Sequence, residues 1–298
     1  MKVLVTGANG LLGQKLMSLL GSKPELNVLA TGRGECRFEN NYDNIRYSSL
    51  DITLNDEVIK VFNDFMPDAV IHTAAMTNVD ECETDREGCW KLNVNAVEYL
   101  VAAAEKADAH FVHVSTDFIF DGTHGPLTED EIPNPVNYYG ESKLAAEKVV
   151  MKSSTSWSIA RTVLVFGITP NMSRSNIILW VKNSLENQKH IKVVDDQWRT
   201  PTLAEDLAMG CYLIGSKKAE GVFNISGYEM LTPYDMALKT VDYFKLDSSY
   251  IEKSDGSQFT QPAKRPPKTG FIITKARKEL GYQPRSFDEG IAVLAGQL

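Results

Sequence analysis

Tyr139 and Lys143 stand four residues apart in the segment Tyr139-Gly140-Glu141-Ser142-Lys143. Side chains at this spacing share one face of a helix, so the phenol and the ammonium can converge on one ligand. Because a neighbouring ammonium favours the phenolate, we expect Lys143 to lower the pKa of Tyr139. The pair then predicts a proton donor and acceptor near neutral pH. The same spacing also occurs on ordinary solvated helix faces, and it needs support from other residues.

Thr116 supplies a second polar group near the predicted site. It follows residues 111–114, an apolar segment typical of a buried strand. The carboxyl ends of parallel strands face the ligand crevice of an open α/β sheet. We therefore expect Thr116 to lie near Tyr139 and to donate a hydrogen bond to the reacting oxygen.

Three glycines at a spacing of three residues, Gly7, Gly10 and Gly13, follow the first apolar segment and open a helical pattern. Gly7 permits a tight turn, and Gly10 lets backbone N–H groups approach a pyrophosphate. Gly13 lets the helix pack closely on the sheet. The pattern predicts a dinucleotide site, with a purely structural glycine-rich turn as the alternative.

The end of the second apolar segment, Thr31-Gly32-Arg33, lacks the acid with which NAD-binding proteins hold the adenosine ribose. Arg33 can instead pair with a 2′-phosphate. We therefore predict NADP(H) as the cofactor, with NAD(H) as the second choice. A solvated Arg33 is the alternative interpretation.

The elements that must position these groups alternate along the first half of the chain. Apolar strand-like segments separated by helical spacing predict a doubly wound α/β sheet with parallel strands. Thr53 is the expected N-cap of one of these helices. The expected strands are residues 2–5, 28–31, 69–72, 111–114 and 158–160, and the expected helices are residues 11–20, 54–66, 89–106 and 142–152.

Beyond residue 166, prolines divide the chain into shorter segments. We predict a dinucleotide-binding domain over residues 1–165, rejoined by parts of 190–225. Residues 166–298 then form mainly a smaller, discontinuous α+β lobe for the substrate. The expected helices here are 177–185, 203–214, 233–244 and 275–280, with strands at 191–194 and 222–225.

Composition excludes several classes of protein. The 298 residues carry 31 basic and 39 acidic side chains, a formal net charge of −8. Nucleic-acid binding needs a net basic face, so we do not expect it. Four cysteines without a C-x-x-C pair favour a reduced cytoplasm. No apolar run approaches the ~18–20 residues of a membrane span, and the segment before Gly7 is too short for a signal peptide.

In this order and spacing, the glycine turn, Ser115-Thr116-Asp117 and Tyr139-x-x-x-Lys143 resemble the extended short-chain dehydrogenases/reductases. Within them the chain is most similar to the dTDP-4-dehydrorhamnose reductase family. The resemblance implies reduction by NADPH of a 4-keto sugar on a nucleoside diphosphate, with dTDP-4-dehydrorhamnose becoming dTDP-rhamnose. Tyr139 would protonate the carbonyl oxygen, Lys143 would hold the nicotinamide ribose, and Thr116 would polarise the carbonyl. A homodimer is also favoured.

Further site residues are implied by the same resemblance. Asn93 would brace the central strands, with a polar contact on its helix as its alternative. Asp117 would accept from a sugar hydroxyl, with capping of the local turn as its alternative. Arg199 and Arg265 are candidates for a diphosphate clamp, with surface solvation as theirs. The expected cofactor contacts are Gly7, Asn9, Gly10, Leu11 and Leu12 at the pyrophosphate, Asp51 and Ile52 at the adenine, and Ala74, Ala75 and Thr77 along the channel, besides Arg33, Tyr139 and Lys143.

Because of three departures from the family pattern, the sequence does not determine the identity of the sugar. Phe118 stands where a tyrosine is frequent, Leu164 where a tryptophan is found, and Arg199 where a glycine is usual. A 4-epimerase or another sugar-nucleotide reductase remains an alternative. So does a non-catalytic NADP-binding subunit similar to the regulatory beta subunit of methionine adenosyltransferase. His72, His110 and His113 are expected to be buried polar groups, and no metal site is expected.

Overall fold

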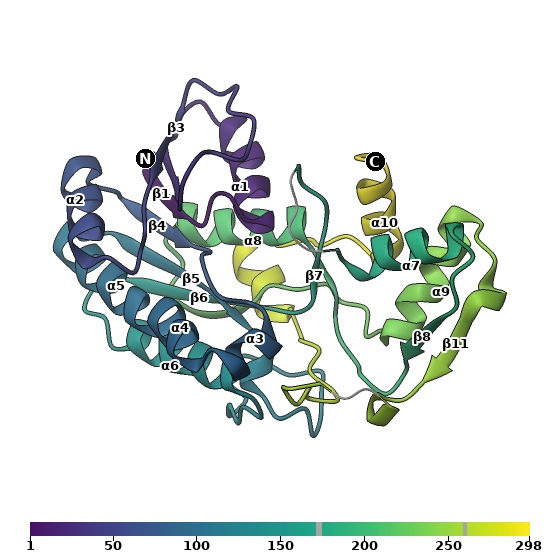
Figure 1. Cartoon of the computed structure of the whole chain (residues 1–298). Coiled ribbons are helices and arrows are strands. Elements are labelled where there is room, and N and C mark those ends of the chain that lie inside the picture. Colours follow the sequence, from purple (N-terminus) through teal and green to yellow (C-terminus); the bar gives the residue numbers. More distant parts are fainter. Residues whose placement is uncertain (171–174, 259–260) are drawn as a thin grey trace.

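A seven-stranded parallel sheet forms the centre of the computed structural model, which describes residues 1–170, 175–258 and 261–298 (Figure 1). The strand order β10-β6-β5-β4-β1-β2-β3 reverses direction at β1, as in dinucleotide-binding sheets. This confirms the predicted doubly wound α/β fold. The strands are β1 (Lys2–Thr6), β2 (Asn27–Gly32), β3 (Ile45–Ser49), β4 (Ala69–His72), β5 (His110–Thr116), β6 (Trp157–Thr162) and β10 (Gly221–Asn224).

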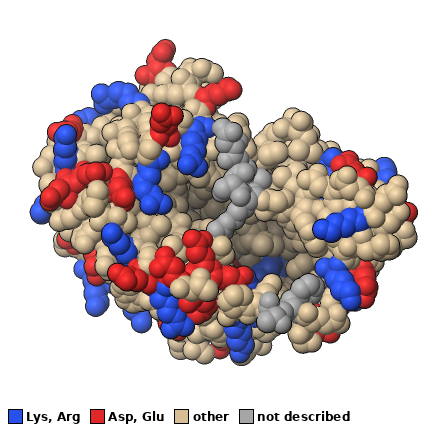
Figure 2. Space-filling model, in the orientation of Figure 1, with Lys and Arg blue, Asp and Glu red and all other residues tan. Residues whose placement is uncertain are grey.

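A smaller α+β part lies beside the sheet, and Figure 2 shows the surface hollowed between the two parts. Its helices pack on one another through two apolar clusters that are separate from those of the sheet. This part contains two parallel strand pairs, β8 with β11 and β7 with β9. The elements are β7 (Val165–Phe166), α7 (Ile177–Glu186), β8 (Ile191–Val194), β9 (Thr202–Leu203), α9 (Pro233–Phe244), β11 (Ile251–Ser254) and α10 (Phe287–Ala295).

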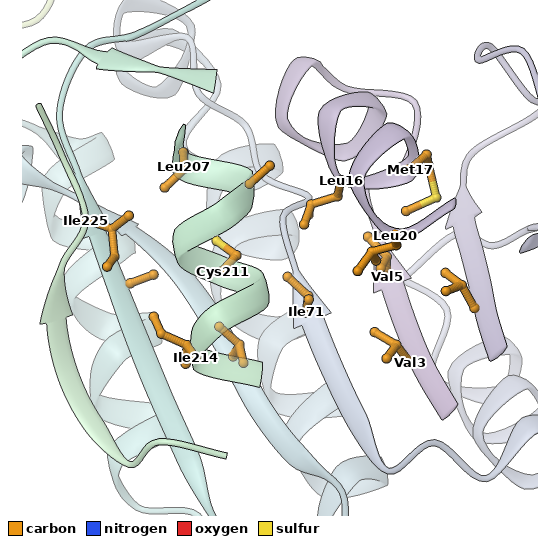
Figure 3. Packing of buried hydrophobic residues seen from close by; sticks show 14 of the residues in the cluster. Val3, Val5, Leu16, Met17, Leu20, Ile71, Leu207, Cys211, Ile214 and Ile225 are labelled. Atoms are coloured by element: carbon orange, nitrogen blue, oxygen red, sulfur yellow. The ribbon is translucent and has the colours of Figure 1, made fainter. Parts of the chain in front are cut away.

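Helices cover both faces of the sheet because its strands are apolar on both sides. On one face, α1 (Leu11–Gly21) and α8 (Ala204–Lys217) lie over β1 and β4, as Figure 3 shows. Leu16 of α1 and Cys211 of α8 point toward the strands there. The opposite face is covered by α2 (Asn55–Phe65), α5 (Ala96–Ala107) and α6 (Tyr138–Met151). None of the described helices is long and apolar enough to cross a bilayer.

The prediction of one continuous helix over residues 89–106 is wrong. The structure has α4 (Arg86–Trp90), then a π-helical turn (Lys91–Asn95), then α5. π-Helical turns often mark functional sites, because the wider turn re-aims side chains. Here the turn holds Asn93, whose buried side chain reaches outside the helix. The short helix α3 (Val79–Thr84), which precedes α4, was not predicted.

One further local prediction fails, and one strand was not predicted. Thr53 does not cap α2, because Leu54 occupies the N-cap position and Thr53 donates both its N–H and its hydroxyl to Asp51. The edge strand β3 was missed because only Ile45 of its five residues is fully buried. An edge strand buries too little apolar surface to show a clear periodicity in the sequence.

The chain returns to the central sheet after visiting the smaller part. Strand β10 pairs with β6, and α8 packs against α1. By contrast, β8, within residues 190–225, pairs with β11 and not with the central sheet. Residues 275–280 contain a π-helical segment (Ala276–Leu280) that packs beside α8. The proposed domain limits at residues 165 and 166 stay a prediction.

Candidate active site

Helix α6 places Tyr139 at the carboxyl edge of the sheet. Asn137 is its N-cap, and the side-chain oxygen of Asn137 accepts from the N–H of Gly140 at 2.8 Å. The amide group of Asn137 also donates to the carbonyl of Lys264, at 2.8 Å. This cap starts the helix at Tyr138, so that Tyr139 lies in its first turn and is buried.

The structure brings the Tyr139 phenol next to the Thr116 hydroxyl, whose hydrogen bonding opposes the rise in the pKa of Tyr139. The Thr116 hydroxyl donates to Oδ1 of Asp117 at 3.1 Å and accepts from the N–H of Phe118 at 3.2 Å. These two contacts hold the Thr116 hydroxyl at the end of β5, next to Tyr139.

The prediction that Lys143 lowers the pKa of Tyr139 is wrong in this structure. Burial raises the pKa of Tyr139 well above its ordinary value, although the hydrogen bond with Thr116 acts in the opposite direction. Lys143 directs its ammonium at β5 instead, where Nζ donates to the carbonyl of Val114 at 2.7 Å and lies 3.1 Å from Nε2 of His113. Sequence spacing correctly placed both residues on one helix, but it cannot show where the ammonium points.

Asp117 is fully buried and makes its contacts inside the protein. Besides Thr116, the Thr269 hydroxyl donates to it, and Nε of Arg199 lies 3.7 Å from its Oδ2. Burial raises the pKa of this carboxyl, and the positive charge of Arg199 opposes that shift. The Asp117 carboxylate thus orients the Thr116 hydroxyl, and its predicted contact with a sugar hydroxyl stays a prediction.

Of the two arginines expected at the diphosphate, burial excludes surface solvation for Arg199, whereas Arg265 is partly exposed and ion-paired. Arg199 is buried, and its guanidinium donates to the carbonyls of Pro266 at 2.6 Å and Trp198 at 2.8 Å. Arg265 forms an ion pair with Asp80. Both guanidinium groups therefore hold the segment 263–269 in place, and a role toward a diphosphate stays a prediction.

Phe118 lies between these groups. Its ring is edge-on to Tyr139, with the ring centroids 6.0 Å apart. The Arg199 guanidinium stands 5.7 Å from the centroid of the same ring. Leu164, the other substitution in the family pattern, is exposed and has a positive φ of 35°. Both side chains are apolar where the family pattern offers polar contacts.

The glycine turn fits the pyrophosphate of a dinucleotide. Gly7 has a φ of 76°, and a Cβ there would lie 2.6 Å from Oγ1 of Thr73. A Cβ on Gly13 would lie 2.2 Å from the carbonyl oxygen of Gly7, whereas Gly10 faces open space except for that same oxygen. Helix α1 begins at Leu11 without a side-chain cap and without an acid in its first turn. Its first N–H groups are therefore suited to an anion.

Asn9 organises the loop that follows β2. Its amide group donates to the carbonyl of Glu35 at 2.9 Å and to the Tyr47 hydroxyl at 3.0 Å, and its oxygen accepts from the N–H of Arg37 at 2.9 Å. A surface pocket there is lined by Arg33, Gly34, Glu35, Cys36, Arg37, Phe38, Glu39 and Pro170. Two arginines and two glutamates thus line this pocket, and of the two arginines only Arg33 was expected from the sequence.

Asn93 connects the loop after β4 to α6. Its oxygen accepts from the N–H of Met76 at 2.8 Å, and its amide group donates to the Ser142 hydroxyl at 3.0 Å. The loop contains the predicted channel residues Ala74, Ala75 and Thr77, of which the two alanines are partly buried. Asp51 and Ile52, the predicted adenine contacts, follow β3, and Ile52 is buried. These contacts with a cofactor stay predictions.

Sequence reasoning missed the roles of His113 and Thr269. His113 was expected only as a buried polar residue, and no motif connects it to Lys143. Thr269 lies 152 residues from Asp117, so no local signal exists. Among residues 1–170, 175–258 and 261–298, no three His, Cys, Asp or Glu side chains are grouped as metal ligands.

Comparisons with known proteins agree with this geometry. Residues 1–298 match the family model described as the RmlD substrate binding domain. The beta subunit of methionine adenosyltransferase 2 from Rattus norvegicus is 31% identical over 255 residues, which are 84% of this chain and 74% of that protein.

Two crystal structures are similar over 100% of this chain and 99% of their own. One, a dTDP-4-dehydrorhamnose reductase from Clostridium acetobutylicum, has a TM-score of 0.87 and 30% identity. The other, a dTDP-4-dehydrorhamnose reductase from Bacillus anthracis in complex with NADP, has a TM-score of 0.85 and 26% identity. The motifs, the fold and the match along the whole length agree, and the chain belongs to the RmlD substrate binding domain family.

Proposed function

We propose that this protein is an NADPH-dependent reductase of a 4-keto sugar carried on a nucleoside diphosphate, with dTDP-4-dehydrorhamnose as the substrate and dTDP-rhamnose as the product. The observation that carries the proposal is the placement of the buried Tyr139 phenol beside the Thr116 hydroxyl, at the edge of the sheet where the uncapped N-terminus of α1 also lies. The similarity to reductases of this substrate supports it.

Each residue of the site has its own role in the reaction. Bound NADPH supplies a hydride to the carbonyl carbon. Tyr139 gives its phenol proton to the carbonyl oxygen, so the ketone becomes an alcohol with its atoms and charge in balance. Thr116, held by Asp117, supplies a second hydroxyl next to that oxygen. Lys143 keeps one N–H for the cofactor ribose, because two are directed at Val114 and His113.

Burial keeps the phenol in its protonated form, but it also makes the phenol a weaker acid. A pKa raised by burial keeps Tyr139 protonated throughout the neutral range. Transfer of its proton then depends on the developing negative charge of the carbonyl oxygen, which exists only as hydride arrives. The proton is therefore held in place until the reaction needs it.

The preference for NADPH rests on the two arginines of the loop after β2. Arg33 and Arg37 line the same pocket, and no acid ends β2. Guanidinium groups bind phosphate by paired hydrogen bonds, and these two line the pocket together with Glu35 and Glu39. NADH is the second choice, because the pyrophosphate turn serves both cofactors equally.

The residues of the sugar pocket define the ligand less closely than those of the cofactor site. Phe118 and Leu164 replace residues that the family pattern would use for ligand contacts. A panel of nucleotide sugars in a thermal-shift assay identifies the ligand, since binding to the native state raises its apparent stability. We expect deoxythymidine diphosphate sugars to raise the melting temperature most.

The decisive experiment mixes the protein with NADPH and dTDP-4-dehydrorhamnose and follows the nicotinamide absorbance. Tyr139→Phe should lower the rate by about 10²–10⁴-fold and still bind NADPH, because it removes only the proton donor. Tyr138→Phe is the matched control, since its neighbouring phenol stacks against Arg86 outside the site. An unchanged rate in Tyr139→Phe would remove this residue from the mechanism.

A regulatory role is the second candidate, favoured by the similarity to the beta subunit of methionine adenosyltransferase 2. It predicts capture of a stoichiometric enzyme partner from native extract, in an NADP⁺-dependent way, without turnover of any sugar. A 4-epimerase would instead keep its cofactor and consume no NADPH. We further propose a cytoplasmic homodimer, which light scattering of the purified protein and cell fractionation test.

A further inference from the structure

A buried imidazole lies directly behind Lys143. His113 is fully buried on β5, and its Nε2 lies 3.1 Å from Nζ of Lys143. An ammonium group has only donors, so Nε2 must be the acceptor and the ring proton must sit on Nδ1. Burial and the charge of Lys143 hold the pKa of His113 well below its ordinary value, which keeps the ring neutral and able to accept.

The second acceptor for Lys143 comes from the next residue of the same strand. The carbonyl of Val114 accepts from Nζ at 2.7 Å. Strand β5 therefore accepts two hydrogen bonds from the Lys143 ammonium. These two acceptors fix the direction of its third N–H. Without the imidazole, a single carbonyl would hold a flexible four-carbon side chain, and the ammonium could rotate about that contact.

We propose that His113 is a positioning residue of the reaction: its Nε2, together with the Val114 carbonyl, aims the remaining N–H of Lys143 at the ribose of the cofactor. The inference rests on the proposed function, because it assigns Lys143 to the nicotinamide ribose. It assigns a task to a residue that no motif in the chain connects with catalysis.

The surroundings of Lys143 make a neutral imidazole necessary. His72 on β4 stacks on His113 with ring centroids 5.3 Å apart, and its Nδ1 is hydrogen-bonded to Thr6. A proton on either ring would place a second buried positive charge beside the ammonium. In this part of the described structure, Nδ1 of His113 and Nε2 of His72 have no hydrogen-bond partner that would favour such a charge.

Two of the other titratable groups near Lys143, Glu147 and Cys89, favour its ammonium form. Glu147 lies one turn further along α6 and is paired with Arg161, Tyr139 lies one turn before, and Cys89 is on α4. Burial lowers the pKa of Lys143 to about 8, while Glu147 and Cys89 act in the opposite direction. A hydrogen bond to the charged form stabilises it, so loss of the imidazole acceptor should lower this pKa further.

The test compares variants that differ in whether they can accept a hydrogen bond. His113→Phe removes the acceptor and keeps the aromatic volume, whereas His113→Gln keeps an acceptor near the position of Nε2. His113→Met, a flexible apolar side chain, repeats the first case if the phenylalanine variant does not fold. His110→Gln is the matched control, because His110 lies on the same strand and contacts Ser156 and Ser158 instead of Lys143.

NADPH affinity, measured by fluorescence titration across a range of pH, is the main readout. We expect His113→Phe to weaken binding about ten-fold, the usual effect of losing one hydrogen bond to a charged group. We also expect the alkaline loss of affinity to begin at lower pH, which a purely structural defect would not produce. His113→Gln and His110→Gln should keep the wild-type pH profile.

Two results would overturn the inference. One is a folded His113→Phe or His113→Met with unchanged affinity and pH profile. The other is a His113→Gln variant as impaired as His113→Phe, which would assign the effect to packing of the ring. If the sugar is not reduced but the affinities change as expected, the proposed reductase fails and the role of His113 stands.

Discussion

Arg265 and Asp80, 185 residues apart in the chain, form a two-pronged ion pair, with Nη1 2.6 Å from Oδ1 and Nη2 2.7 Å from Oδ2. The Arg265 hydrogen bonds hold the pKa of Asp80 below its ordinary value. The pair anchors the segment 263–269 on α3, and the same segment carries Thr269 to Asp117. The ion pair therefore helps to hold the Thr269 hydroxyl against Asp117 in the active site.

We expect Arg265→Ala to lower the free energy of unfolding by about 1–2 kcal/mol, the usual range for a partly exposed charged hydrogen-bond pair. Urea denaturation measures it. Asp80→Asn breaks the same pair from its other end and serves as the matched variant. If both variants raise the KM for the nucleotide sugar equally, the pair acts by holding the segment. If only Arg265→Ala raises it, Arg265 contacts the diphosphate directly.

The buried pair between Arg161 and Glu147 predicts a larger effect. Nε and Nη2 of Arg161 donate to the two carboxylate oxygens at 3.0 and 2.7 Å, and neither side chain is more than 3% exposed. Arg161→Met leaves a buried carboxylate unpaired, which should cost about 3–5 kcal/mol of unfolding free energy. Chemical denaturation should show most of that loss recovered in the double variant Arg161→Met/Glu147→Leu.

A surface pair controls for the general effect of removing a charge. Lys192 and Glu252 lie 3.2 Å apart with both side chains more than half exposed. Lys192→Met should change stability by less than about 1 kcal/mol. A similar loss in Lys192→Met and Arg161→Met would contradict the importance of burial.

The centre of the fold was predictable because it combines several independent local signals. All four residues of β4 are buried, and Gly7 and Gly13 stand where a side chain would collide with backbone or side-chain atoms. Each of these features can be recognised from the types and spacing of a few neighbouring residues. The parallel order of the strands then follows from the helices between them.

The contacts that decide the chemistry of the site were not predictable in this way. The spacing of Tyr139 and Lys143 places them on one helix, but the ammonium turns to β5 because His113 and the Val114 carbonyl offer acceptors there. The support of Asp117 by Thr269 spans 152 residues. Pairing of distant segments is a property of the folded chain, and no short window of the sequence contains it.

The two arginines of the loop after β2 predict the choice of cofactor. Arg33→Ala should weaken NADPH binding about 10–100-fold, since it removes charge-assisted hydrogen bonds to the 2′-phosphate. Binding of NADH, which lacks that phosphate, should stay within about two-fold. Arg37→Ala shows whether the second arginine shares the contact. Equal losses for both cofactors would place Arg33 away from the 2′-phosphate.

The buried histidines predict how stability depends on pH. Burial lowers the pKa of His72 to about 3, and the charge of Lys143 acts in the same direction. Between its unfolded pKa of about 6.5 and that value, the unfolded chain binds a proton that the folded chain does not. The stabilising effect is complete above the unfolded pKa and is lost as the pH falls, by about 1.4 kcal/mol per pH unit.

Urea unfolding at about pH 7 and about pH 5 measures this slope. His72→Gln should reduce the loss of stability on acidification by close to one proton's contribution, because the variant has no imidazole to protonate in the unfolded chain. His124→Gln is the comparison variant, because it removes an exposed imidazole, which lies 3.2 Å from Glu131, instead of a buried one. If the His72→Gln slope equals that of the wild type while both remain folded, His72 is protonated in the native protein, and the stacked imidazoles beside Lys143 are not both neutral.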